Sequence, residues 1–142
     1  MNDYGISGFG GIFFRSDNPG ETMAWYEKNL GLKTDGQYGA NLEWRPSENP
    51  SSTAYSVWSP FSADTAYFEP SEKDFMVNFR VKNLGKLLEK LKADGIMPVG
   101  EMQEFEYGKF AWVIDPNGIK IELWEPNDES FSAMCGDKIH KT

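Results

Sequence analysis

Residues 115–126 read Asp-Pro-Asn-Gly-Ile-Lys-Ile-Glu-Leu-Trp-Glu-Pro and carry the clearest structural signal in the chain. The first four residues are strong turn formers, and the alternation that follows is typical of a strand leaving a hairpin. An earlier segment, Tyr55–Pro60, repeats the second half of this stretch 66 positions before it, with Trp and Pro at matching places. The sequence therefore indicates that a strand of this kind occurs twice.

Two strand–helix passages extend the repeat. An apolar strand pattern at 11–15 is followed by a helix pattern at 18–31, and the same order returns at 76–81 and 83–95. Each helix pattern opens with Asn, a good N-cap, and closes with Gly, which readily ends a helix. The offset between the two passages is 65 residues at the strands and 64 at the closing glycines. This nearly constant spacing predicts two copies of one unit.

The repeat predicts an α+β fold built from two tandem βαβββ modules, whose mixed sheets form a concave cup. Module 1 covers about 6–60, a linker about 61–73, module 2 about 74–126, and a polar C-terminal tail 127–142. The 142 residues fit a single domain of this kind. We expect the tail to be a surface appendage.

Charge and composition exclude several classes of function. The chain has 14 Lys and Arg against 22 Asp and Glu, and the resulting net charge of −8 disfavours nucleic-acid binding. No apolar run is long enough for a membrane span. The single histidine, His140, rules out a site that needs two imidazoles from one chain. The lone Cys135 and an N-terminus unlike a signal peptide favour a cytoplasmic protein.

Side chains alternate across a strand, so the two faces of the expected sheet can be separated. One face is uniformly apolar, includes Phe14, Tyr55, Val57 and Phe79, and is expected beneath the helices. The other face mixes rings with polar groups, and its members include Phe13, Ser56, Trp58, Met76, Asn78, Glu122 and Trp124. Large aromatic side chains are rarely left in water without a reason, which favours a ligand-binding concavity over an ordinary solvated face.

Two such units in tandem, the second closed by Asp115–Pro126, resemble the vicinal oxygen chelate superfamily. This family includes glyoxalase I, bleomycin-resistance proteins, fosfomycin-resistance enzymes and extradiol dioxygenases. The resemblance covers about residues 6–126, and its other specific piece runs from Asn18 through Trp25 to Leu32. It implies a homodimer that binds a small molecule in the cup.

The resemblance also implies a divalent metal ion, held by His, Glu or Gln at four pseudo-symmetric positions on the first and last strands of each half. The repeat places these positions at Gly11, Ser56, Met76 and Glu122. Gly offers no side chain, Met is too soft for a hard dication, and Ser is a weak ligand. Only Glu122 remains, and we therefore predict that this chain holds neither the family's metal ion nor another cofactor.

Without the metal ion, the favoured function is binding of a small, partly aromatic molecule, in the manner of the bleomycin-resistance members. The predicted ligand-binding residues are Phe13, Ser56, Trp58, Met76, Asn78, Trp112, Glu122 and Trp124. The rings supply contact area, while Glu122 and Asn78 orient the ligand. The alternative is a glyoxalase-like lyase or isomerase, similar to lactoylglutathione lyase, with Glu122 as metal ligand or general base. A third possibility is an acid–base enzyme with no cofactor.

Overall fold

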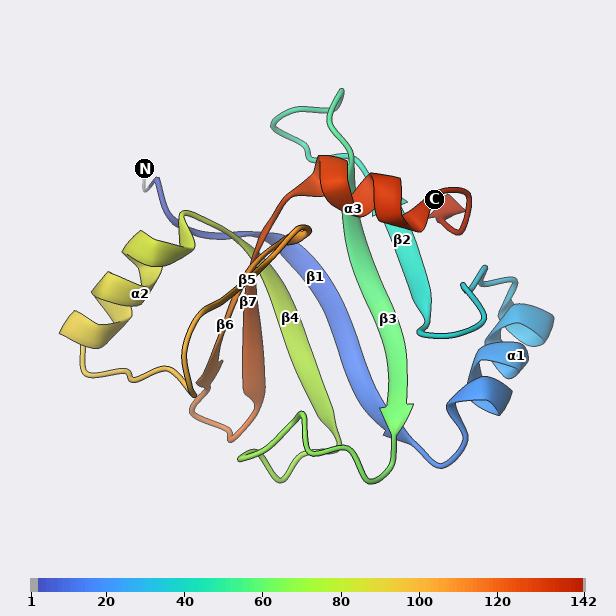
Figure 1. Cartoon of the computed structure of the whole chain (residues 1–142), viewed down its shortest axis with the longest axis horizontal. Helices are drawn as coiled ribbons and strands as arrows, with labels where there is room; N and C mark the ends of the chain where they lie inside the picture. Colours follow the sequence, from blue (N-terminus) through green and yellow to red (C-terminus); the bar gives the residue numbers. More distant parts are fainter. Residues whose placement is uncertain (1–2, 142) are drawn as a thin grey trace.

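The computed structural model describes residues 3–141 and forms one layer of sheet with helices beside it (Figure 1). None of the helices in this part of the chain is long and apolar enough to cross a membrane. The elements follow one another as β1 (Gly5–Ser16), α1 (Pro19–Leu30), β2 (Ala40–Trp44), β3 (Ala54–Ser62), β4 (Phe75–Lys82), α2 (Leu84–Ala93), β5 (Gln103–Phe105), β6 (Gly108–Ile114), β7 (Lys120–Pro126), α3 (Asp128–Cys135) and β8 (His140–Lys141).

Within residues 3–141, one mixed sheet of eight strands runs in the order β5-β6-β7-β4-β1-β3-β2-β8. The antiparallel pair β1–β4 lies at its centre, and the parallel pairs β1–β3 and β4–β7 flank it. The strands of the first repeat therefore lie on one side of the β1–β4 seam and those of the second repeat on the other. The predicted α+β fold of βαβββ modules is confirmed.

Helix caps account for where α1 and α2 begin. The Asn18 side chain accepts a hydrogen bond from the Glu21 backbone N–H at 3.1 Å, and Pro19 occupies the first helical turn. The Asn83 side chain accepts in the same way from the Lys86 N–H at 3.3 Å. These bonds satisfy backbone donors that a helix end leaves free, as the sequence predicts.

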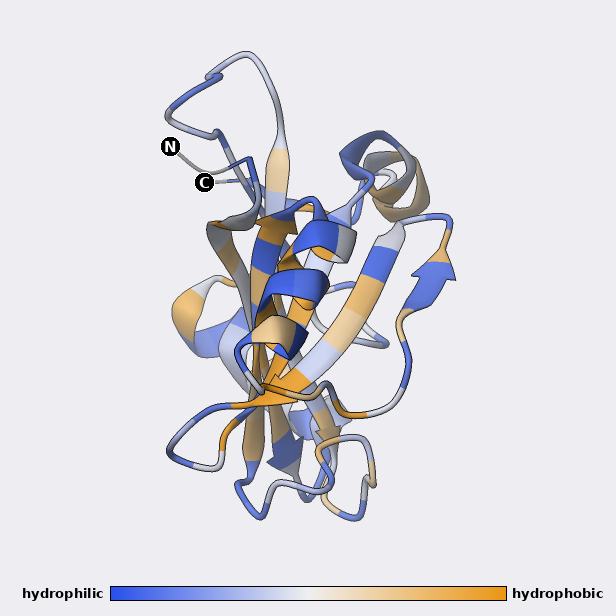
Figure 2. Cartoon of the chain, turned by 90° about the vertical axis from the view of Figure 1, so that its left-hand side faces the viewer, coloured by the Kyte–Doolittle hydropathy of each residue, from blue (hydrophilic) through white to orange (hydrophobic). Residues whose placement is uncertain are grey.

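Two apolar clusters lie on opposite faces of the sheet. Beneath α2, Leu84 and Leu88 pack with Val81, Ala111 and Leu123. Figure 2, which views the molecule from the α2 side, shows hydrophilic residues on the outer face of this helix and mainly hydrophobic strands behind it. The second cluster is rich in rings and consists of Phe13, Phe68, Met76, Phe110, Trp112 and Trp124. The face without the two long helices is thus apolar as well, which an ordinary solvated sheet face would not be.

The C-terminal tail is part of the fold, and the prediction of a surface appendage is wrong for its described residues. Asn127 caps α3 by accepting from the Ser130 N–H at 3.1 Å, and β8 pairs with β2. Arg80, buried on β4, donates two hydrogen bonds to Asp128 at the start of this helix. Phe131 packs its ring 5.3 Å from that of Trp124. Phe131 also packs 5.1 Å from the Tyr55 ring, and the Tyr55 hydroxyl hydrogen-bonds to Ser132 of α3 at 2.8 Å. These few contacts hold α3 over the sheet, and the polar sequence of the segment did not predict them.

Candidate functional site

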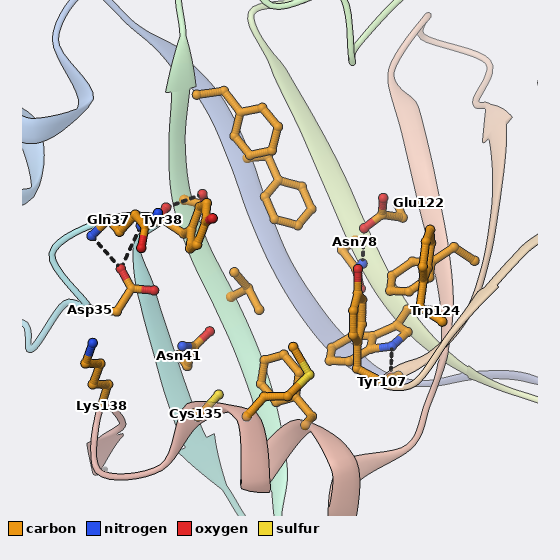
Figure 3. A pocket seen from close by; sticks show the side chains of 18 of the residues that line it. Asp35, Gln37, Tyr38, Asn41, Asn78, Tyr107, Glu122, Trp124, Cys135 and Lys138 are labelled. Carbon is orange, nitrogen blue, oxygen red and sulfur yellow. Dashed lines mark hydrogen bonds between the residues drawn. The ribbon is translucent and has the colours of Figure 1, made fainter.

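The ring-rich face of the sheet and α3 enclose a cavity of about 560 Å³ (Figure 3). Strands of both repeats form its floor, the loop after α1 and the C-terminal tail close one end, and the segment between β3 and β4 contributes Tyr67. Its lining residues are Phe13, Asp35, Gln37, Tyr38, Asn41, Val57, Ser59, Phe61, Tyr67, Asn78, Phe105, Tyr107, Phe110, Glu122, Trp124, Phe131, Met134, Cys135 and Lys138.

Aromatic rings make up most of the cavity wall. Phe110 and Trp124 lie nearly parallel with their centroids 5.9 Å apart, and Phe13 packs 5.5 Å from Phe61. Phe131 of α3 covers this group from above, in contact with Trp124. Ring surfaces at these separations present flat apolar area with little side-chain freedom to lose on binding. The wall is therefore suited to a flat, apolar part of a ligand.

Glu122 is the buried charge of the site. It lies on β7, is 3% exposed, and its carboxylate accepts three hydrogen bonds. The Asn78 amide donates to one oxygen at 2.7 Å, while the Trp112 indole, at 2.9 Å, and the Tyr67 hydroxyl donate to the other. The groups that hold Glu122 come from β4, β6 and the β3–β4 segment, so the fold fixes the carboxylate from three directions.

The buried surroundings shift the pKa values of Glu122 and of two groups near it, Tyr67 and Lys120. Burial raises the pKa of Glu122, and the three hydrogen bonds oppose this rise only in part. Burial, followed by the negative charge of Glu122, raises the pKa of the Tyr67 hydroxyl. Burial lowers the pKa of Lys120, whose ammonium group donates to the Tyr67 carbonyl at 2.6 Å. The Glu122 carboxyl, with its raised pKa, lies beside the Tyr67 hydroxyl, which stays protonated. A carboxyl group in such a place can take part in proton transfer.

A pair of glycines on β1 makes room for Asn78. A Cβ atom at Gly10 would stand 1.7 Å from the Asn78 Oδ1, and a Cβ at Gly11 would stand 1.8 Å from the Val57 carbonyl oxygen. Gly11 also has a φ of 131°, in the region that favours glycine. The glycines thus let the Asn78 amide lie flat on the floor with its NH2 group toward Glu122. Its Oδ1 is buried and has no hydrogen-bond partner among the residues that the structure describes.

Half of the predicted ligand-binding residues line the cavity. Phe13, Asn78, Glu122 and Trp124 do so. Met76 and Trp112 are buried in the ring-rich cluster, and Trp112 reaches the site only through its bond to Glu122.

Ser56 and Trp58 lie on the opposite face of the sheet, so their predicted orientation is wrong. The ring of Trp58 packs 4.2 Å from Tyr26 of α1, and the Ser56 hydroxyl accepts from the Trp44 indole and donates to the Phe9 carbonyl. Val57, which the alternation placed under the helices, lines the cavity instead.

The error comes from the register of the repeat in its last strand. Phe13 pairs with Ser59 on β3, and Asn78, the counterpart of Phe13, pairs with Glu122 on β7. Ser59 is therefore the true counterpart of Glu122, three residues beyond Ser56. A slip by an odd number of residues moves every side chain of a strand to the other face.

Several lining residues carry no signal that sequence reasoning detected. Tyr67 stands in a segment read as a linker, and Phe131 and Cys135 stand in the tail. Tyr107 and Asp35 occupy loops next to strands. A ring in a polar stretch, as with Phe131, is the one hint that could have drawn attention to the tail.

The four metal positions of the resembled family are, after correction of the register, Gly11, Ser59, Met76 and Glu122. Ser59 donates its hydroxyl hydrogen to the Tyr38 carbonyl, and Met76 is fully buried with a thioether that suits soft metals. Glu122 alone offers a hard ligand. Throughout residues 3–141, no group of three or more His, Cys, Asp or Glu side chains is placed to hold a metal ion. This donor set does not fit a hard divalent cation.

A family model described as the Glyoxalase/Bleomycin resistance protein/Dioxygenase superfamily matches residues 8–123. No curated protein matches the sequence.

Solved structures share the fold at low identity. Methylmalonyl-CoA epimerase from Mycobacterium tuberculosis has a TM-score of 0.59 at 17% identity, over 89% of this chain and 93% of that one. Streptomyces coelicolor methylmalonyl-CoA epimerase in complex with 2-nitronate-propionyl-CoA has a TM-score of 0.61 at 12% identity, over 87% and 99%. NAD-dependent benzaldehyde dehydrogenase from Legionella pneumophila has a TM-score of 0.53 at 11% identity, over 82% and 98%. At these identities the likeness shows the fold alone.

Proposed function

The chain belongs to the glyoxalase/bleomycin resistance protein/dioxygenase superfamily, and on that premise we propose that it binds a small, partly aromatic molecule in its cup without a metal ion. The observation that carries this proposal is the ring-lined cavity of about 560 Å³. Sites for small molecules commonly enclose roughly 300–1,000 Å³ and combine apolar walls with a few fixed polar groups. Phe13, Phe61 and Phe131 supply the walls, while Glu122 and Asn78 are the fixed polar groups.

The bonds that Glu122 already makes support a metal-free site. Its two oxygens accept from Asn78, Trp112 and Tyr67, which occupy three of the roughly four acceptor positions of a carboxylate. A divalent cation needs several strong ligands. The other three family positions supply none.

The charge of the lining argues against carrying over the ligands named for the structural neighbours. Two of those neighbours are methylmalonyl-CoA epimerases, one of them in complex with an acyl-CoA analogue. Coenzyme A bears several phosphate charges, and such ligands are normally met by several Lys or Arg side chains. Lys138 is the one cationic side chain in the lining found among the described residues. The proposal is therefore limited to small molecules without phosphate groups.

Thermal unfolding tests both parts of the proposal. Treatment with EDTA followed by Ni²⁺ or Zn²⁺ should leave the Tm unchanged, whereas a two-ring aromatic such as indole or quinoline should raise it by mass action. Phe131→Ala removes one ring from the cavity wall and should weaken aromatic binding about tenfold, or about 1.4 kcal/mol. Trp25→Ala, which removes an exposed ring on α1, is the matched control and should change nothing. A Tm that rises with metal after EDTA would overturn the metal-free proposal.

A second candidate function is proton transfer by Glu122, as in a lyase or isomerase of this family. The observation in its favour is the carboxyl with a raised pKa, in contact with the Tyr67 hydroxyl and lining the cavity. In such a reaction the carboxylate takes a proton from carbon and returns it.

Solvent exchange tests this second candidate. A small phosphate-free ketone with an acidic C–H, such as 2-tetralone, should exchange that hydrogen in D2O with the protein present, as followed by NMR, and should not do so with Glu122→Gln. Exchange at the uncatalysed rate with the unmodified protein would remove this substrate from consideration.

We further propose that the protein is a cytoplasmic homodimer. The resemblance to the family supports a dimer, because its members usually form homodimers. The edge strand β5 also supports it, since Phe105 there is 46% exposed and Met102 lies beside it. Light scattering coupled to size exclusion should give twice the mass of one chain, and the mass of a single chain would contradict the dimer. The exclusion of nucleic-acid partners stays a prediction that rests on the net charge.

A further inference from the structure

The cavity has one charged group at its deep end. Asp35, Glu122 and Lys138 are the ionisable Asp, Glu and Lys side chains in its lining. Figure 3 shows Asp35 and Lys138 together at one end, beside Cys135, with Glu122 and Asn78 at the other end. A ligand that reaches the Glu122 end therefore meets a carboxylate, and no Lys or Arg side chain of the lining lies beside it.

The cations nearest to this end are directed elsewhere. The Lys120 ammonium group donates to the Tyr67 carbonyl and lies 5.3 Å from the centre of the Tyr67 ring. Arg80 donates to both carboxylate oxygens of Asp128. The groups that hydrogen-bond to Glu122 are a phenol, an indole and an amide, all of them neutral. Glu122 therefore has neutral hydrogen-bond donors and forms no ion pair in the described part of the chain, although the charge of Lys120 acts on it from a distance.

Acceptor capacity is also in surplus at Glu122. The Asn78 Oδ1 is buried against Gly10 of β1, so it offers no acceptor to a ligand. The Glu122 oxygen that Asn78 contacts accepts one hydrogen bond, from the Asn78 amide, and a carboxylate oxygen can accept two. A donor group of a ligand can therefore bind at this oxygen.

Rings surround the same end. Tyr67 and Tyr107 both line the cavity, and the charge of Glu122 contributes to the raised pKa of each hydroxyl, after burial as the larger cause. The face of an aromatic ring attracts a cation, and together with a carboxylate such rings recognise ammonium groups. The carboxylate of Glu122, with its free acceptor position, and the ring surface beside it thus favour one chemical class.

We propose that the ligand is an arylalkylamine bound as its ammonium form, with the nitrogen at Glu122 and the ring among Phe13, Phe61 and Phe131. This inference rests on the proposed function, because it assigns the class of molecule that the same cavity binds.

Three indole compounds of similar shape but different charge test the inference. Tryptamine, tryptophol and indole-3-propionate carry an ammonium, a hydroxyl and a carboxylate on the same two-carbon arm, and calorimetry at pH 7 gives their Kd values. Tryptamine should bind at least tenfold more tightly than tryptophol, and indole-3-propionate should bind most weakly. Equal binding of all three, or tighter binding of the carboxylate, would overturn the amine assignment and leave the proposed function standing. Binding of none of them would overturn both.

A matched pair of variants locates the effect at the deep end. Glu122→Gln removes the charge there and should bring the Kd ratio of tryptamine to tryptophol close to one. Asp35→Asn removes the other carboxylate of the lining, at the far end, and should keep the ratio of the unmodified protein. Loss of the preference in Asp35→Asn but not in Glu122→Gln would contradict the placement. If Glu122→Gln does not fold, the charge ladder on the unmodified protein decides alone.

Discussion

The two halves of the cup occupy matching places in the sheet but present different side chains to its interior. In the first half, Phe13 pairs with Ser59 across β1 and β3. In the second half, Asn78 pairs with Glu122 across β4 and β7. At these paired positions the first wall presents a ring and a hydroxyl bonded to the backbone, and the second presents an amide and a hydrogen-bonded carboxylate.

The repeat therefore fixes where equivalent residues lie in the sheet, but it does not fix which chemical groups they carry. The backbone pairing is the same on both sides of the β1–β4 seam, since each half contributes a parallel pair of strands. At the paired positions the first wall supplies ring surface, and the second supplies charge. If this division of roles is correct, substitutions at equivalent positions should have unequal effects.

The largest effect is expected where the first wall depends on backbone contact. Gly11→Ala would drive a Cβ atom into the Val57 carbonyl at a positive φ, which should separate β1 from β3 and cost about 3 kcal/mol or more. A Cβ at its neighbour Gly10 would meet the Asn78 side chain first, with the Asn78 backbone carbonyl oxygen at 3.2 Å, so it mainly displaces a side chain. Gly10→Ala should therefore cost about 1 kcal/mol and mainly weaken ligand binding. Urea unfolding compares the two, and equal losses of stability would contradict this account.

A smaller difference should separate the paired positions themselves. Glu122→Ala leaves the donors of Tyr67, Trp112 and Asn78 without their acceptor, at an expected cost of about 3 kcal/mol. Ser59→Ala loses one hydroxyl bond to the Tyr38 carbonyl, for about 1 kcal/mol. Both values come from urea titration. A Ser59→Ala variant as unstable as Glu122→Ala would show that the two walls are equally polar in effect.

Glu122, in the second wall, should contribute to the pH dependence of stability. The pKa of Glu122 in the folded protein lies above its ordinary value of 4.5. Between these two pKa values the folded chain holds a proton that the unfolded chain has released, so stability contributed by this group falls as the pH rises and levels off above the folded pKa. Glu122→Gln should remove this part of the decline, whereas Ser59→Ala should keep it. Urea midpoints from pH 4 to pH 8 measure the difference, and parallel curves for Glu122→Gln and the unmodified protein would refute it.

The mildest effect concerns the end of the cavity far from Glu122. Burial, together with the Asp35 charge, raises the pKa of the Cys135 thiol to about 11. At pH 7.5, iodoacetamide should therefore modify it about a hundredfold more slowly than an ordinary thiol of pKa near 9. Bound ligand should slow the reaction further. Rapid alkylation, followed by mass spectrometry, would show that this end of the cavity is open to solvent.

The sequence predicts much of the fold because local signals and the repeat agree. The caps at Asn18 and Asn83 form as expected, and the repeat predicts the βαβββ arrangement. Glu122 and Asn78 could be predicted as neighbours because parallel strands β4 and β7 bring them together.

The rest of the site depends on information that side-chain type does not carry. Trp58 and Trp124 occupy similar sequence contexts, but one packs against α1 and the other lines the cavity. Their likeness shifted the apparent register by an odd number of residues, and alternation then reversed a whole strand. Tyr67 and Phe131 reach the cavity through tertiary packing of irregular or polar segments, which no local pattern encodes.

Native mass spectrometry of the protein, purified without added metal and dialysed, tests the central claim most directly. The account predicts chains that carry an organic molecule, or that take up tryptamine when it is supplied, with no mass added by a metal ion. Retention of one divalent cation for each chain, lost together with ligand binding in Glu122→Gln, would contradict it.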